Sequence, residues 1–241
     1  MYGWRARIGL LAPATNATVE NEFRRLAANI EGVTVHVDRV IGPPGPISKQ
    51  WEIDFGKGCL EAAVRVASVE PNVIAIGNTS GTFINDEVEM INEIEKATNI
   101  PVVTTANSVV QSLKRLKVHK LGVATPYPPE FNEYLRKYLT GNGFNIVDFK
   151  SRHTMDILTI GRYEPSVAYN LARTLQGNFD GIFISCTDFR TIDVLNSLEE
   201  DMGVPVISSN LSTFSESLLR IGIKSPIHGF GSLLTRKFLV Q

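Results

Sequence analysis

Short apolar runs rich in β-branched residues alternate along the chain with longer stretches that repeat apolar residues every three to four positions. The runs predict strands at 7–12, 33–40, 73–76, 102–105, 120–125, 145–151, 181–185 and 204–208. The longer stretches predict helices at 18–28, 54–69, 86–98, 108–116, 129–140, 165–175, 191–201 and 213–221. Nearly continuous apolar strands separated by helices are typical of parallel sheets with helices on both faces. The predicted fold class is therefore α/β, doubly wound, with ligands bound beyond the carboxyl ends of the strands.

The second half of the chain repeats the pattern of the first half. Residues 7–13 (RIGLLAP) match 120–126 (KLGVATP), 74–80 (IAIGNTS) match 182–188 (IFISCTD), 99–105 (NIPVVTT) match 203–209 (GVPVISS), and 112–116 (SLKRL) match 217–221 (SLLRI). Four matches in the same order predict two pseudo-symmetric α/β lobes, residues 1–117 and 118–241. A site between such lobes is lined by equivalent loops from each of them.

The charge balance excludes several kinds of partner. Lys and Arg number 24 against 25 Asp and Glu, and no polybasic run is present, so neither a nucleic acid nor an anionic membrane is an expected partner. No apolar run approaches the roughly 18–20 residues of a membrane helix, and the first residues lack the pattern of a signal peptide. The expected location is the reducing cytoplasm, and association into a homo-oligomer stays open.

The cysteines and histidines predict no metal site. With two cysteines the chain has no disulfide framework and no cysteine-rich zinc site, and its four histidines lack the spacing of metal ligands. No GxGxxG motif follows a predicted strand, so a dinucleotide is not expected. We therefore expect no cofactor.

Cys186 is the candidate for chemistry, because it stands directly after the apolar run 181–185. The next helix is predicted from Thr191. A thiol near a helix N-terminus and beside backbone N–H groups favours the thiolate, so we expect its pKa to lie below the free value of about 8.5. Cys59 lies within the predicted helix 54–69 and is expected to be a core residue.

The counterpart of Cys186 in the first lobe is Asn78, in the Gly-flanked loop 77–81 (GNTSG). Together with the hydroxyls of Thr79 and Ser80 and free backbone N–H groups, its amide suits an anion such as a carboxylate. The alternative is a strand-to-helix turn in which Asn and Ser act as caps.

Similar loops follow two other predicted strands, at 13–20 and 125–130. Asn16 offers an amide to a carboxylate oxygen, and Tyr127 offers a phenol that can donate to a developing oxyanion. Each of them can instead be a cap or a packed ring, and both interpretations stay open.

The sequence resembles the Asp/Glu racemase superfamily over nearly its whole length, as two repeated α/β lobes with a site between them. Members of that superfamily carry one cysteine in each lobe, at the positions that this sequence fills with Asn78 and Cys186. Two opposed cysteines exchange a proton at carbon from opposite faces without a cofactor. Because an amide cannot act as the second base, the resemblance does not imply two-base racemisation here.

Two branches of the superfamily are more similar. Arylmalonate decarboxylases keep only the second-lobe cysteine, and their motifs resemble ATPY at 124–127, SCTD at 185–188 and GVPVISS at 203–209. Maleate cis-trans isomerases resemble the chain at 13–20 (PATNATVE). Those isomerases need the first-lobe cysteine, and they carry an Asn where this chain has Ile157.

The resemblance implies a cofactor-independent decarboxylase of a small 2-substituted malonate-type dicarboxylic acid. Cys186 is then the proton donor in an oxyanion pocket of hydroxyls and amides, which stabilises the enediolate. The expected substrate-binding residues are Asn16, Asn78, Thr79, Ser80, Tyr127 and Thr187. Two alternatives stay open: a maleate cis-trans isomerase-like enzyme that uses Cys186, and a non-catalytic protein that binds a carboxylate.

Overall fold

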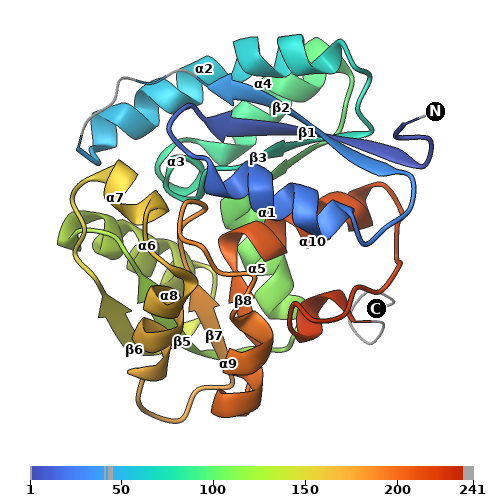
Figure 1. Cartoon of the computed structure of the whole chain (residues 1–241). Helices are drawn as coiled ribbons and strands as arrows, with labels where there is room; N and C mark the ends of the chain where they lie inside the picture. Colours follow the sequence, from blue (N-terminus) through green and yellow to red (C-terminus); the bar gives the residue numbers. More distant parts are fainter. Residues whose placement is uncertain (1, 41, 43–45, 236–241) are drawn as a thin grey trace.

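The computed structural model describes residues 2–40, 42 and 46–235, which form two four-stranded parallel sheets with flanking helices (Figure 1). The first sheet consists of β1 (Ala6–Pro13), β2 (Val33–Val40), β3 (Val73–Ile76) and β4 (Val102–Thr104), in the order β2-β1-β3-β4. The second consists of β5 (Lys120–Thr125), β6 (Asn145–Ser151), β7 (Gly181–Ile184) and β8 (Val206–Ser208), in the order β6-β5-β7-β8. The predicted α/β fold with two parallel sheets is confirmed, and the equivalent strand order agrees with the repeat.

Helices connect the strands in both halves. They are α1 (Thr18–Ala27), α2 (Lys49–Ala67), α3 (Thr79–Ile84), α4 (Glu87–Thr98), α5 (Thr105–Arg115), α6 (Pro129–Gly141), α7 (Ile157–Gly161), α8 (Pro165–Arg173), α9 (Leu195–Met202) and α10 (Ser209–Arg220), with a 3-10 turn at Ser232–Leu234. The short elements α3, α7 and the 3-10 turn were not predicted. No helix in the described part of the chain is long and apolar enough to span a membrane.

Local hydrogen bonds explain where two helices begin. Helix α2 begins at Lys49, earlier than predicted, because the Ser48 hydroxyl accepts a hydrogen bond from the Trp51 backbone N–H at 3.2 Å. Helix α9 begins at Leu195 rather than at Thr191, because residues 191–194 form a turn in which the Val194 N–H donates to the Thr191 carbonyl at 3.0 Å. The Thr191 N–H donates to the Glu22 carboxylate at 2.7 Å. The chain between Cys186 and α9 is therefore a turn rather than a helix.

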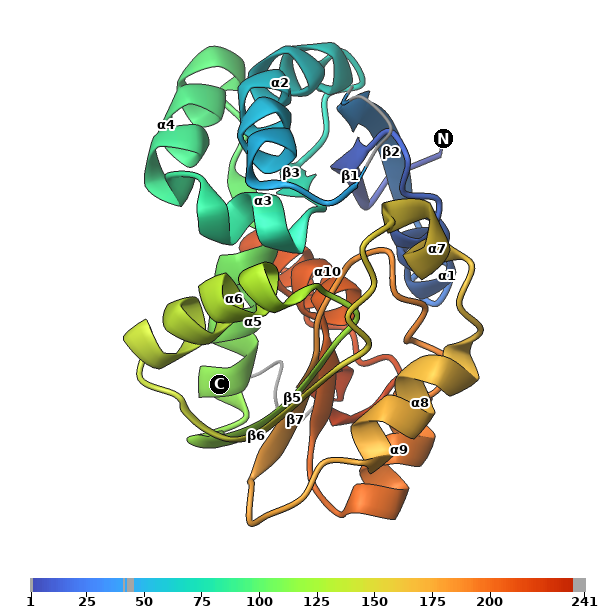
Figure 2. The ribbon, with the colours of Figure 1, turned by 90° about the vertical axis from the view of Figure 1, so that its left-hand side faces the viewer.

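One hydrophobic core extends across both halves of the chain. It includes Ile8 and Leu10 from β1 as well as Val123 from β5 and Phe183 from β7. Between the sheets, α5 and α10 pack against each other, and α10 also contacts β3 and β4 of the other half (Figures 1 and 2). The predicted boundary at residues 117 and 118 thus separates the two sheets but not the core.

A second, smaller cluster lies between the first sheet and helices α2 and α4. Cys59 is part of it, and its side chain is buried among Phe55, Ile74 and Ile94. Burial raises the pKa of the Cys59 thiol far above its ordinary value. The expectation that Cys59 is a core residue is confirmed.

Candidate active site

A closed cavity lies where the central strands of the two sheets end. It is lined by Pro13, Asn16, Ile47, Trp51, Glu52, Asn78, Ser80, Tyr127, Ile157, Ile160, Cys186, Thr187 and Asp188. Its volume of about 20 Å³ is enough for a water molecule. A diacid is larger than this, so at least one covering side chain must move when such a ligand enters. A more open hollow of about 700 Å³ beside β2 contains none of the predicted site residues.

The cavity brings together most of the residues that the sequence pointed to. Asn16, Asn78, Ser80, Tyr127, Cys186 and Thr187 all line it. Thr79 is buried next to it, where its hydroxyl donates to Ser209 Oγ at 2.9 Å. The loops after β1 and β3 of the first sheet and after β5 and β7 of the second therefore meet at one place, because the carboxyl edges of the two sheets both border this cavity.

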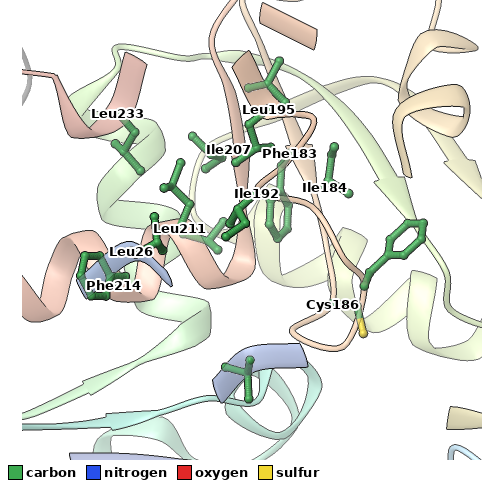
Figure 3. Close-up of a cluster of buried hydrophobic side chains, with 14 of the residues drawn as sticks. Leu26, Phe183, Ile184, Cys186, Ile192, Leu195, Ile207, Leu211, Phe214 and Leu233 are labelled. Atoms are coloured by element: carbon green, nitrogen blue, oxygen red, sulfur yellow. The ribbon is translucent and has the colours of Figure 1, made fainter. Parts of the chain in front are cut away.

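Cys186 follows β7 with a backbone φ of 97°, a conformation that is strained for any residue other than glycine. Its backbone N–H donates to Ser209 Oγ at 3.1 Å, which helps to hold the strained turn. Figure 3 shows Cys186 at the edge of the core, with the sulfur pointing away from the labelled hydrophobic side chains. Strain of this kind is concentrated at functional sites in proteins.

Burial, together with a smaller effect of the Asp188 carboxylate, raises the pKa of the Cys186 thiol to about 12. Hydrogen bonds from the backbone of Asp188 and Phe189 and from Tyr127 oppose this effect without cancelling it. The sequence-based expectation of a lowered pKa is wrong, because the chain after Cys186 turns instead of starting a helix and the sulfur is buried. At neutral pH the cavity therefore contains a protonated thiol.

Tyr127 places its phenol hydroxyl in the cavity wall, within 3.5 Å of Ser185 Oγ. Its ring is buried, and its centroid lies 6.2 Å from that of Phe131. Burial raises the pKa of Tyr127 well above its ordinary value, although hydrogen bonds to Ser185 and Thr79 lower it. Tyr127 is thus a neutral hydrogen-bond donor beside the thiol.

Asn16 connects the two halves of the site. Its side-chain amide donates to the Thr187 hydroxyl at 3.0 Å, and its carbonyl oxygen accepts from the backbone N–H groups of Thr18 and Val19 at 2.9 and 3.0 Å. The Thr187 carbonyl in turn accepts from the Asn210 amide at 2.9 Å. The first turn of α1 therefore fixes the residue that follows Cys186.

Glu52 is a buried carboxyl group in the cavity wall that the sequence analysis did not predict. Asn78 Nδ2 donates to its Oε2 at 2.8 Å, and Ser80 Oγ donates to its Oε1 at 2.5 Å. The pKa of Glu52 is raised to about 7, because the effect of burial is larger than the opposing effect of the two hydrogen bonds. Asn78 also caps α3 by accepting from the Gly81 N–H at 3.2 Å, so its predicted capping role is present as well.

Asp188 is a second cavity-lining carboxyl group that was not predicted. Burial raises its pKa to about 7, while hydrogen bonds from Thr18 and the charge of Arg39 lower it. Gly161 of α7 approaches this carboxyl group so closely that a β-carbon there would come within 2.9 Å of it. Neither acid shows a distinctive sequence pattern, because Glu and Asp are mostly exposed in proteins.

The wall combines a protonated thiol, a neutral phenol, amides, hydroxyls and two carboxyl groups with the side chains of Ile47, Trp51, Ile157 and Ile160. Such a wall can hold a carboxylate by hydrogen bonds and place an uncharged surface beside a second substituent. Within the described residues, no group of three or more His, Cys, Asp or Glu side chains is placed to hold a metal ion.

A family model described as arylmalonate decarboxylase matches residues 57–234. The maleate isomerase of Geobacillus stearothermophilus is 22% identical over 248 residues, covering 96% of this chain and 98% of that protein. The arylmalonate decarboxylase of Bordetella bronchiseptica is 26% identical over 132 residues, covering 54% of this chain and 55% of that protein. Among solved structures, a Nocardia farcinica maleate cis-trans isomerase mutant with a covalently bound succinylcysteine intermediate has a TM-score of 0.90 at 20% identity, covering 96% of this chain and 98% of that one.

Proposed function

This chain belongs to the arylmalonate decarboxylase family, and we propose that it is a decarboxylase of a small 2-substituted malonate-type dicarboxylic acid. The resemblance found in the sequence motifs is confirmed by this family match. Relatives that cover most of the chain are maleate isomerases, so the chain is an enzyme of this branch rather than a carboxylate-binding protein without turnover. The choice between the two reactions rests on the chemistry of the cavity.

The burial of Cys186 in the wall of the cavity is the observation that carries the proposal. A thiol whose pKa is raised to about 12 retains its proton at neutral pH. It is therefore equipped to deliver a proton to a carbanion in the cavity, which is the second half of a decarboxylation. A nucleophile, in contrast, must be a thiolate.

The apolar part of the wall supports the first half of the reaction. A carboxylate placed against Ile47, Ile157 and Ile160 loses its hydration without gaining a hydrogen bond from these side chains, which favours its departure as uncharged CO₂. The carbon–carbon bond breaks, and its electron pair stays on the α-carbon as an enediolate of the retained carboxylate. Cys186 then gives its proton to that carbon, and water returns a proton to the thiolate.

The retained carboxylate needs hydrogen-bond donors as it gains charge. Tyr127 and the amide of Asn16 line the same cavity and supply donors of this kind. Thr187 adds a backbone N–H and a hydroxyl on the side of Cys186. Because the only thiol of this wall reaches the substrate from the second half of the chain, the proton arrives on one face, and a single enantiomer is the expected product.

A maleate isomerase-like reaction is the second candidate, and the position of Asn16 favours it. Its amide lies in the cavity and contacts Thr187, next to Cys186. In this reaction the Cys186 sulfur adds to the double bond, the new single bond rotates, and the sulfur leaves. The thiol must first lose its proton to a neighbouring base such as Asp188, which its high pKa disfavours.

An NMR screen in D₂O separates the candidates. The protein is incubated with phenylmalonate, methylmalonate, maleate and aspartate, and the products are followed by ¹H and ¹³C spectra. Decarboxylation is expected to yield monoacid with deuterium at the α-carbon. Conversion of maleate into fumarate without decarboxylation of any malonate would reverse the order of the two candidates.

Tyr127→Phe should lower kcat by about 10²-fold, because one oxyanion donor of this kind contributes 10²–10³. We expect KM to change little, since the ring remains packed. The urea midpoint should fall only slightly, because the hydroxyl contacts that are lost, with Ser185 at 3.5 Å and with Thr79 and Cys186, are hydrogen bonds between neutral groups. The matched control is Tyr134→Phe, which removes a hydroxyl that contacts Glu130 outside the cavity. Equal kcat values for the two variants would exclude Tyr127 as an oxyanion donor.

A further inference from the structure

Glu52 and Cys186 approach the same cavity from opposite halves of the chain. Glu52 comes from α2, which covers the first sheet, and Cys186 comes from the end of β7 in the second. The Glu52 carboxyl group is bound by Asn78, which the internal repeat aligns with Cys186. The structure thus holds an ionisable group beside the first-half equivalent of the thiol position.

The hydrogen bonds of Glu52 are compatible with both of its protonation states. When Glu52 is ionised, Ser80 Oγ donates to Oε1 at 2.5 Å and Asn78 Nδ2 donates to Oε2 at 2.8 Å. Ser80 Oγ also lies 3.3 Å from Asn78 Oδ1. When Glu52 is protonated in the free protein, it can donate to Ser80 Oγ, and the serine proton can turn to Asn78 Oδ1. When a carboxylate is bound, the single Glu52 proton can instead point to that ligand, while Ser80 Oγ and Asn78 Nδ2 continue to donate to the carboxyl group. A proton can therefore be added without leaving a buried polar atom unpaired.

The cavity has no positive charge to receive a dianion. Its described lining contains no Lys or Arg, but it contains the carboxyl groups of Glu52 and Asp188. The guanidinium of Arg39 is directed elsewhere, because it donates to the Pro13 and Asn16 carbonyls and pairs with Glu20. A substrate with two carboxylates thus meets acidic groups in a buried site, where repulsion between like charges is strong.

The groups that face Glu52 from the neighbouring elements do not offset this repulsion. On its own helix Glu52 is coupled to Cys59, which is a neutral thiol, and no charged side chain contributes to the shift of the Glu52 pKa. Across the cavity are Tyr127 and Cys186, which are also neutral at pH 7, and Asp188. Helix α3, which packs on α2, contains no titratable side chain.

On the basis of the proposed function, we propose that Glu52 is a substrate-binding residue that takes up one proton when the dicarboxylate enters and donates a hydrogen bond to one of its carboxylates. The ligand class is a diacid that is captured as the dianion together with one proton. The hydroxyl and amide donors of Asn16, Thr187 and Tyr127 remain for the other carboxylate.

The pKa of Glu52 in the free protein sets the pH range in which proton uptake on ligand binding can be measured. Burial raises its pKa to about 7 in the free protein, and a bound dianion raises it further. At pH 8 the free group is mostly ionised and the bound group is protonated, so binding takes up about 0.9 proton. At pH 6 the free group is already mostly protonated, and uptake at Glu52 falls to about 0.1 proton. Above pH 7 the Kd of the dianion should rise about tenfold per pH unit.

Calorimetric titration with phenylmalonate and with maleate, in phosphate and in Tris buffer at pH 6 and pH 8, measures this uptake. Cys186→Ala is the background, so that no turnover adds heat. In that background Glu52→Gln provides a permanently neutral donor in place of a protonated carboxyl group. We expect the Glu52→Gln variant to bind the dicarboxylate at pH 8 about tenfold more tightly than its Cys186→Ala parent. Its proton uptake on binding should be lower by about one proton. The matched control is Glu61→Gln on the exposed face of the same helix, which should change neither value.

Ser80→Ala is a second test variant, and it keeps the Glu52 carboxyl group. It deletes a donor to the ionised form, so the midpoint of the pH dependence should move upward. The inference is overturned if Glu52→Gln takes up as many protons on binding as its Cys186→Ala parent. It is overturned as well if the midpoint of the pH dependence of binding is unchanged in Ser80→Ala. Neither result affects the proposed function. If no diacid binds or is converted by the unmodified protein, the proposed function fails as well, which distinguishes the two failures.

Discussion

Cys186→Ala should abolish turnover, with a fall in kcat of about 10²–10⁴-fold, the range that a positioned general acid contributes. The physical reason is that the buried thiol is the proton donor of the cavity, with a pKa raised to about 12. Alanine keeps the β-carbon, so the backbone strain at φ 97° is unchanged and only the sulfur is lost. Steady-state kinetics with the best substrate of the NMR screen, together with circular dichroism, measures the effect.

Cys59→Ala is the matched control, because it removes the same atom from the core cluster under α2. It should lower the free energy of unfolding by about 1–2 kcal/mol through the small cavity it leaves, with kcat near that of the unmodified protein. Retained turnover in Cys186→Ala would discard both the decarboxylase and the isomerase proposals.

Cys186→Gly tests whether the site stores strain. Glycine adopts positive φ without steric cost, so this variant should be more stable than Cys186→Ala by about 1 kcal/mol even though both are inactive. Urea unfolding of the two variants gives the difference. Equal stability would mean that the backbone at Cys186 is not strained.

The strands and the place of the site could be predicted from the sequence because both depend on local patterns. Buried parallel strands such as β3 and β7 read as continuous apolar runs, and parallel strands end at a common edge. The loops that contain Asn78 and Cys186 follow equivalent strands of the two sheets, and the repeat predicted that they line a shared site. Their meeting depends in addition on the packing of α5 against α10 between the sheets.

Glu52 could not be predicted, because its burial depends on contacts that have no local pattern. Its helix starts at Lys49 through the Ser48 cap, and the predicted helix began after Glu52. The short helix α3, which supplies Ser80, is a Thr-, Ser- and Gly-rich segment without helical periodicity. The one available signal was Ser48, a favourable N-cap residue shortly after a Pro-rich loop.

The pKa of Cys186 was predicted in the wrong direction for a similar reason. The residue pattern predicts a helix from Thr191, but residues 191–194 form a turn, and the backbone N–H groups of Thr191 and Ile192 donate to Glu22 of α1. That contact joins residues far apart in the sequence. The loss of the nearby helix end and the burial of the sulfur both act against the thiolate.

Glu22 itself should be among the most important residues for stability. Its buried carboxylate accepts from the backbone N–H groups of Thr191 at 2.7 Å and Ile192 at 3.2 Å and from Asn210 Nδ2 at 2.7 Å. All three donors belong to the second half of the chain, whereas Glu22 lies on α1. One side chain therefore ties the first half to the turn after Cys186.

Glu22→Ala should lower the free energy of unfolding by about 3 kcal/mol, because it leaves three buried donors without an acceptor and each costs about 1–3 kcal/mol before water enters. Glu22→Gln should cost less, since one amide oxygen still accepts. Urea unfolding measured by fluorescence and circular dichroism gives these values. The control is Glu164→Ala, which breaks an exposed ion pair with Arg190 and should change stability by at most about 0.5 kcal/mol.

The same substitution should also reduce kcat, because Asn210 connects Glu22 to the Thr187 carbonyl beside the thiol. A turn released from Glu22 holds Thr187 and Cys186 less firmly, and misplacement by about 1 Å can cost about 10²-fold in rate. We therefore expect Glu22→Ala to lower kcat well below that of Glu164→Ala at a temperature where both remain folded. An unchanged urea midpoint together with an unchanged kcat in Glu22→Ala would show that this contact does not hold the two halves or the site in place.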